Sequence, residues 1–147
     1  MIVIDIFGED AIRQSIEQIT WFYPEKAVGI DDSWKSYNDL KATFPMTTSS
    51  TYTLKSVQNG QAQIEMIADI QSDTTSPITM GQLEMRYDIS GRQDGNLNVD
   101  IASGLPLSST VSLNYDGYIH VSGVGDDPPQ SWPISATGTV TITFQKK

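Results

Sequence analysis

The sequence predicts a mainly β fold, an antiparallel meander of about seven strands that forms a curled sheet or a barrel-like fold, with one N-terminal helix packed on it. Two observations favour this class. Apolar and polar residues alternate over several segments, as they do in strands with one buried face. Asn-Gly and Asp-Gly pairs recur between such segments, and these pairs favour the turns of β-hairpins. We expect the meander over about 43–146.

The first hairpin has the best-defined register. A three-residue loop over 58–60, with its glycine in the left-handed conformation, places Leu54 opposite Ile64 and Lys55 opposite Gln63. A two-residue turn at the same Asn-Gly pair would set apolar residues opposite polar ones throughout. We therefore expect the three-residue loop.

Two further hairpins follow from the same reasoning, with loops at 93–95 and 115–117. Each loop requires a glycine at positive φ, namely Gly95 and Gly117. The last strand, about 134–144, alternates cleanly and is long enough to bend at a glycine, which suits a curled sheet.

The helix is expected over about 10–22. Isoleucines recur there at helical spacing, and Pro24 ends the segment because proline disfavours helical conformation in the residue before it. The apolar residues that would dock on the sheet are Ile12, Ile16 and Ile19.

Composition excludes several classes of function. With 147 residues the chain suits a single β domain, 1–147, or the C-terminal part of a longer protein. A net charge of -9 argues against nucleic acid or an anionic membrane surface as partner. The absence of cysteine excludes disulfides and thiolate metal sites. No run of residues is long and apolar enough for a transmembrane segment, and we expect any signal or anchor segment to lie outside this sequence.

Candidate chemical groups are few. His120 is the only histidine and falls on the wet side of a predicted strand, so a zinc site or a serine triad lacks parts. Asp94 and Asp100, with the asparagines between them, alternate along a strand instead of curling around a point as calcium ligands do. We expect no enzyme activity, no cofactor and no metal site.

The candidates for ligand or partner contacts are Trp34, Trp132, Asp126 and Asp127, all in predicted loops. A loop tryptophan either anchors a partner or plugs the end of a sheet, and we favour the plug. The adjacent carboxylates either bind a cation or are solvated.

One motif resembles a known family. Pro24 and Val28, followed by Asp32-Ser33-Trp34, are similar to the Pro-x-x-x-Val and Gly-Asp-Ser-Trp signature of an uncharacterised family of bacterial envelope proteins. Asp31 stands where that pattern has glycine. The resemblance covers about 22–144 and implies an extracytoplasmic protein that is periplasmic, attached to the outer membrane or secreted. It implies no activity.

The expected function is therefore a non-catalytic extracytoplasmic binding or structural module of the bacterial cell envelope, whose partner is an envelope protein, a glycan or a lipid. The alternative is a carrier of an apolar ligand such as a lipid, held in a cavity between helix and sheet.

Overall fold

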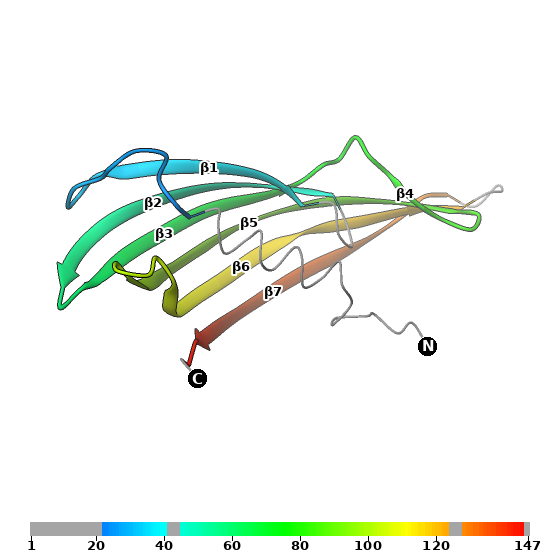
Figure 1. The fold of residues 1–147 in the computed structure, drawn as a ribbon. Coiled ribbons are helices and arrows are strands. Elements are labelled where there is room, and N and C mark those ends of the chain that lie inside the picture. Colours follow the sequence, from blue (N-terminus) through cyan, green and yellow to red (C-terminus); the bar gives the residue numbers. More distant parts are fainter. Residues whose placement is uncertain (1–21, 41–44, 124–127, 146–147) are drawn as a thin grey trace.

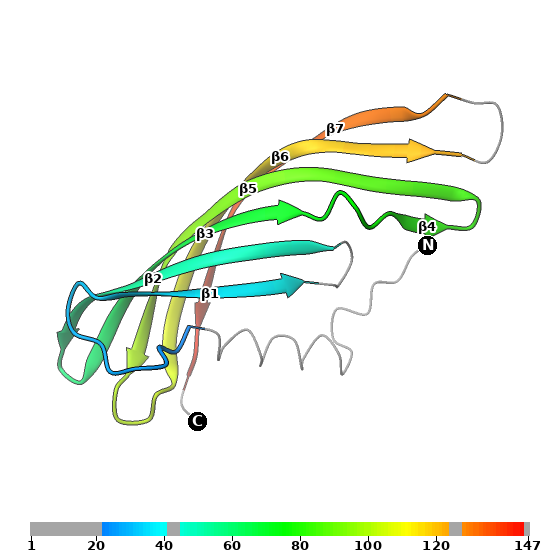
Figure 2. The ribbon, with the colours of Figure 1, turned by 90° about the horizontal axis from the view of Figure 1, so that it is seen from above.

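The computed structural model describes residues 22–40, 45–123 and 128–145. They form one antiparallel sheet with the order β1-β2-β3-β5-β6-β7, and β4 pairs with β5 outside this path. The strands are β1 (Ser33–Leu40), β2 (Met46–Gln58), β3 (Gln61–Ser72), β4 (Ile78–Met80), β5 (Leu83–Asp100), β6 (Pro106–Ser122) and β7 (Gln130–Thr143). Figures 1 and 2 show that the sheet is a single layer that curls along its long strands.

The predicted antiparallel meander of seven strands is confirmed, but the barrel-like alternative is wrong. The sheet is open, with β1 and β7 as its two edges. Closure would require these edges to pair. They differ greatly in length, since β1 has 8 residues and β7 has 14.

The helix packed on the sheet must also be corrected, because the described residues contain no helix. The predicted segment, about 10–22, lies outside them except for Phe22. The spacing of the isoleucines predicts only which side of a helix would be buried. Whether a short helix forms depends on tertiary packing, which a sequence pattern does not show. None of the described residues belongs to a helix long and apolar enough to cross a membrane.

In the first hairpin the predicted pairing of apolar residues is present, but the turn differs from the predicted one and the strand contains a bulge. Leu54 pairs with Ile64 as predicted. However, φ is 51° at Asn59 and 74° at Gly60, which indicates a two-residue type I′ turn instead of the three-residue loop. A bulge between Leu54 and Ser56 then shifts the register by one, so Gln63 faces Ser56 and not Lys55. The bulge restores the match between apolar faces that the turn alone would break.

The other two predicted hairpins are wrong, because β5 and β6 run straight through the Asp-Gly pairs. Gly95 lies opposite Val111, and Gly117 lies opposite Ile89. A Cβ added at Gly95 would come within 2.3 Å of the Thr110 carbonyl oxygen. One added at Gly117 would come within 2.0 Å of the carbonyl oxygen of Asp88. These glycines therefore allow a close approach of two strands instead of reversing the chain.

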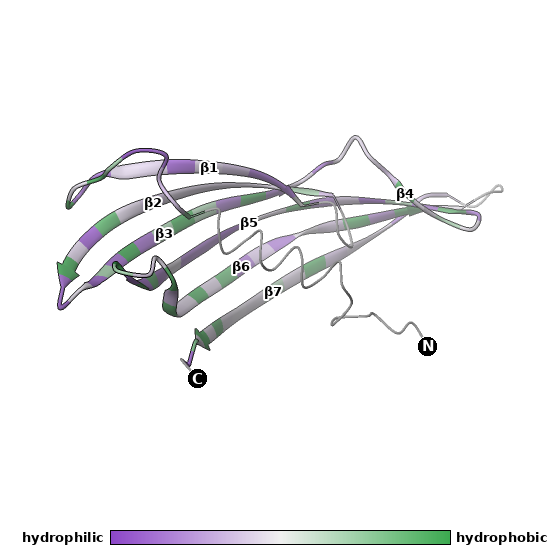
Figure 3. Ribbon diagram, viewed as in Figure 1, coloured by the Kyte–Doolittle hydropathy of each residue, from purple (hydrophilic) through white to green (hydrophobic). Residues whose placement is uncertain are grey.

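The register sorts the side chains onto two faces, and the hydropathy alternates along the strands accordingly (Figure 3). We call the side that carries the aliphatic and aromatic residues the apolar face. Its members on the longer strands include Tyr52, Leu54, Ile64, Met66, Ile70, Met85, Ile89, Leu97, Val99, Val111, Leu113, Ile119, Val121, Trp132, Ile134, Val140 and Ile142. The opposite side, the polar face, carries mainly Ser, Thr, Asn, Gln and charged residues.

The buried core occupies one part of the apolar face. Its main cluster consists of Phe22, Tyr52, Leu54, Ile64, Met66 and Val99, and Ala68, Ile70 and Ile89 are also buried. Val28 and Trp34 pack against this cluster, and the Tyr23 hydroxyl donates a hydrogen bond to the Gly104 carbonyl. The segment that precedes β1 is thus fixed to one end of the sheet.

Candidate binding surface

The apolar face is exposed away from the core. Trp132, Val140 and Ile142 on β7 are 49%, 60% and 47% exposed. Met80 and Leu83, at the turn that joins β4 to β5, are 49% and 46% exposed. We call these five residues, together with the half-buried Met85, Val111, Ile119, Val121 and Ile134 that the register places among them, the open apolar strip.

Strand register makes the strip continuous. Trp132 lies beside Ile119, which lies beside Tyr87. Further along the same strands, Val140 lies beside Val111. Every residue of β7 that faces this side between 132 and 142 is apolar or glycine. At about 3.3 Å per residue, these positions extend over roughly 33 Å.

The covered part of the same face has a different character. Tyr52 and Met66, on β2 and β3, are 6% and 8% exposed. Burial raises the pKa of the Tyr52 hydroxyl, and a side-chain hydrogen bond with Ser50 only partly opposes this effect. The apolar face therefore forms a core at the β2–β3 side and a solvent-exposed surface at the β7 side.

Trp34 lies on β1 and not in a loop as predicted. Its indole Nε1 donates a hydrogen bond of 2.7 Å to the Phe22 carbonyl. Its ring stacks on Tyr52, with the centroids 5.9 Å apart. Trp34 thus packs against the core cluster.

Trp132 is also a strand residue, because it lies on β7 at the opposite edge of the sheet from Trp34. The structure therefore does not bring the two predicted tryptophans together. Trp132 belongs to the open apolar strip. Asp126 and Asp127 lie outside the described residues.

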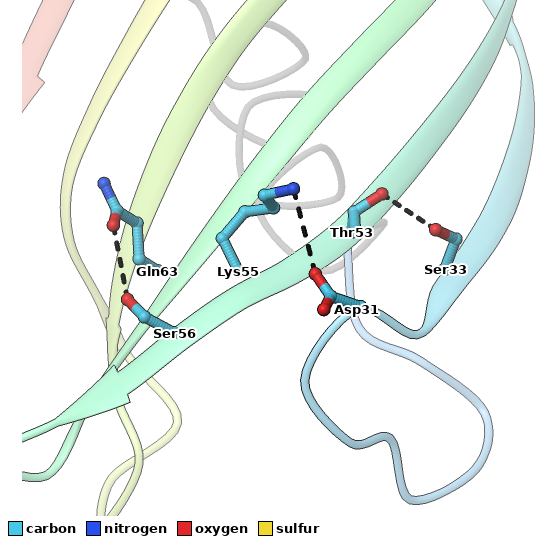
Figure 4. Close-up of polar contacts among 6 residues, drawn as sticks. All are labelled: Asp31, Ser33, Thr53, Lys55, Ser56 and Gln63. Atoms are coloured by element: carbon cyan, nitrogen blue, oxygen red, sulfur yellow. Dashed lines mark hydrogen bonds and ion pairs between the residues drawn. The ribbon is translucent and has the colours of Figure 1, made fainter.

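A cleft of about 560 Å³ lies beside β1, lined by residues 23–28 and 32–36. Pro24, Val28 and residues 32–34 contribute to the walls of this cleft, but the polar groups of 32–34 hold the chain in place. The Asp32 carboxylate accepts a hydrogen bond of 2.7 Å from the Gly29 N–H. The Ser33 and Thr53 hydroxyls are 2.8 Å apart and hydrogen-bonded (Figure 4). These contacts give Asp32 and Ser33 a structural role.

The polar face offers little clustered chemistry. Asp94 and Asp100 are spread along β5, and Asp94 lies within this strand instead of in the predicted loop 93–95. Within 22–40, 45–123 and 128–145, no group of three or more His, Asp or Glu residues is placed to hold a metal ion. His120 shares a hydrogen bond of 2.7 Å with the Ser131 hydroxyl of the neighbouring strand. This pair links β6 to β7 on the polar face.

The aliphatic residues of the strip are not among the contact residues that the sequence predicts. The signal was present, because the apolar alternation continues to the end of β7 and no charged residue occurs between 128 and 145. An edge strand normally carries charge. A long uncharged strand is therefore informative once the structure shows that it lies at an edge.

The sequence pattern of a family of unknown function, DUF6263, matches residues 3–106. This range includes β1 to β5 and ends at the first residue of β6. No curated protein and no solved structure matches the chain.

Proposed function

Because the chain belongs to DUF6263, a family of unknown function, we propose its role from the sheet itself: a non-catalytic binding module of the bacterial cell envelope that holds the acyl chain of a lipid on the open apolar strip. The observation that carries the proposal is the exposure of Trp132, Val140 and Ile142 on one face of the sheet.

The physical reason is the cost of exposing apolar surface to water, about 25 cal/mol per Å². A sheet with one apolar face is normally covered by a second layer along its whole width. In the described residues the exposed part of that face is concentrated at the β4 and β7 side. A bound apolar ligand would cover it.

The dimensions and relief of the strip favour an acyl chain over a rigid ligand. The hydrocarbon core of a bilayer is about 30 Å thick, so one lipid chain spans about half of that, and the strip is roughly twice as long as such a chain. The small residues Ala136 and Gly138 make the middle of the strip shallow. No atom lies within 4 Å of the position that a Gly138 Cβ would take. Met80, at one end of the strip, has a flexible side chain that suits adaptable apolar contacts.

The envelope location rests on the resemblance of Pro24, Val28 and the segment 32–34 to an extracytoplasmic family. The ligand would then be an envelope lipid. Nothing in the proposal requires catalysis, a cofactor or a metal.

The test is titration of the purified protein with a fluorescent fatty-acid analogue, followed by displacement with an envelope phospholipid. We expect stoichiometric binding at micromolar concentration. Val140→Asp places a charge on the strip and should weaken binding at least tenfold. Asn114→Asp adds the same charge to β6 on the polar face and should leave binding unchanged.

Equal losses in the two variants would show that the probe does not use the strip. Absence of saturable binding to the wild-type protein would overturn the lipid part of the proposal.

A further inference from the structure

We infer that the outer edge of β7 pairs antiparallel with β7 of a second copy of the chain, so that two sheets join across a twofold axis. This inference concerns assembly and goes beyond the proposed lipid binding. It rests on the length, the composition and the symmetry of one edge strand.

The edge is long and open. β7 comprises 14 residues and pairs only with β6 among the described residues. All of its side chains are exposed except Ile134 and Ala136, which are half-buried. Its pairing with β6 shows no bulge. The free N–H and C=O groups of such a strand form a regular template for another strand.

The edge also lacks the usual protection. Natural edge strands avoid unwanted pairing by being short, by carrying charge, or by means of proline and bulges. After Pro133, β7 continues for ten residues without proline or charge. The opposite edge, β1, has 8 residues and carries the exposed charges of Lys35 and Asp39. The β1 edge is therefore protected against pairing with another chain, whereas the β7 edge after Pro133 is not.

The sequence of β7 is complementary to itself. Its polar face carries threonine at every second position, 137, 139, 141 and 143. Its apolar face carries Gly138, Val140 and Ile142. Consider an antiparallel pair of two β7 strands centred at position 140, midway between 138 and 142. Threonine then lies opposite threonine, and each aliphatic residue lies opposite an aliphatic residue or glycine. A slip by one residue would break both matches.

Hydrogen bonds between opposed hydroxyl groups already link β6 to β7 on the polar face. Hydroxyls of Thr110 and Thr141 are 3.3 Å apart, and those of Ser112 and Thr139 are 3.1 Å apart. A second copy would extend the hydroxyl row on the polar face and continue the apolar face, with Val140 and Ile142, across the twofold axis. The net charge of -9 opposes association in general, but the uncharged edge brings no like charges into contact.

The first measurement is the solution mass of the full chain by sedimentation or light scattering over a concentration series. We expect a reversible dimer of twice the 16.2 kDa monomer mass. Thr141→Lys should raise the dimer dissociation constant at least tenfold, because it brings two ammonium groups together near the axis. Tyr37→Lys adds the same charge to the polar face of β1 and should not change it.

Cross-linking then locates the interface. The chain has no cysteine, so single cysteines at 137–143 can be oxidised cleanly. A disulfide needs Cα atoms about 4.4–6.8 Å apart, and directly opposed residues of an antiparallel pair are about 4.5–5.5 Å apart. We expect a dimer band that peaks at one β7 position and is absent for Tyr37→Cys.

A monomer at all concentrations up to millimolar, a dimer insensitive to Thr141→Lys, or cross-linking through Tyr37→Cys would each overturn the inference. Thr141→Lys leaves the apolar face intact and should still bind the fatty-acid probe. Loss of dimerisation and loss of lipid binding are thus distinguishable.

Discussion

Asp31 has a left-handed backbone conformation, with φ of 69°. This conformation costs most L-residues roughly 1–2 kcal/mol, although aspartate tolerates it better than most. The turn is held by a hydrogen bond of 2.7 Å from the Asp31 N–H to the Leu54 carbonyl. Lys55 Nζ lies 3.9 Å from the Asp31 carboxylate (Figure 4). The two side chains are 44% and 78% exposed, so this ion pair adds little stability.

We predict that Asp31→Gly raises the free energy of unfolding slightly, by up to about 1 kcal/mol, because glycine adopts positive φ without steric cost. Urea denaturation would measure the change. Asp32→Gly is the matched control and should be destabilising, since it removes the carboxylate that accepts the Gly29 N–H. Equal destabilisation by both substitutions would contradict this account of the turn.

At the scale of the elements, the long strands β5 and β6 depend on glycines where their backbones approach. Gly117 pairs with Ile89, the most deeply buried large side chain among the described residues. The space for a Cβ at Gly117 is already occupied by backbone atoms of Asp88 and Ile89. A Cβ at Gly117 could be accommodated only if β5 and β6 moved apart, because the atoms that it would meet belong to the backbone. This is a packing requirement between strands, distinct from the turn requirement that the Asp-Gly pair suggests.

Gly117→Ala should therefore cost about 1–3 kcal/mol or more of unfolding free energy through overpacking. Gly138→Ala on β7 is the control, because its added Cβ would meet open space. It should be neutral or stabilise by up to about 1 kcal/mol, by restricting the unfolded chain. Thermal or urea denaturation of both variants checks the prediction, which would be wrong if Gly117→Ala were as well tolerated as Gly138→Ala.

For the whole molecule, the uneven burial of the apolar face implies that stability is concentrated at the β2–β3 side. Met66 is 8% exposed within the core cluster, whereas Leu83 on the open apolar strip is 46% exposed. Equal truncations at these positions remove similar aliphatic groups from very different surroundings. Only the truncation at Met66 leaves a cavity.

We expect Met66→Ala to lower the free energy of unfolding by about 2–5 kcal/mol. Leu83→Ala should cost less than about 1 kcal/mol, because an exposed side chain loses few contacts. Unfolding in urea without added lipid provides both values. A cost at Leu83 as large as that at Met66 would show that the strip is packed and unavailable for a ligand.

The sequence by itself determined the β class, the antiparallel meander and the pairing of Leu54 with Ile64. Alternation with a period of two assigns residues to faces wherever a strand forms, and an Asn-Gly pair at a chain reversal is a local signal. The first hairpin was predictable because its two strands are neighbours in sequence. Its bulge at Lys55 was missed because the loop length and the bulge shift the register in compensating ways.

Only the tertiary structure decided what the pairs Asp94-Gly95 and Asp116-Gly117 do. An Asp-Gly pair is compatible with a turn and also with a strand that needs close backbone approach. The choice depends on β3, β6 and β7, which are distant in sequence and extend each strand past the glycine. The same holds for the tryptophans: local sequence places both in loops, whereas long-range pairing assigns Trp34 to the core edge and Trp132 to the open apolar strip. Which apolar residues are covered is a property of the whole sheet, because alternation identifies a face but not what lies against it.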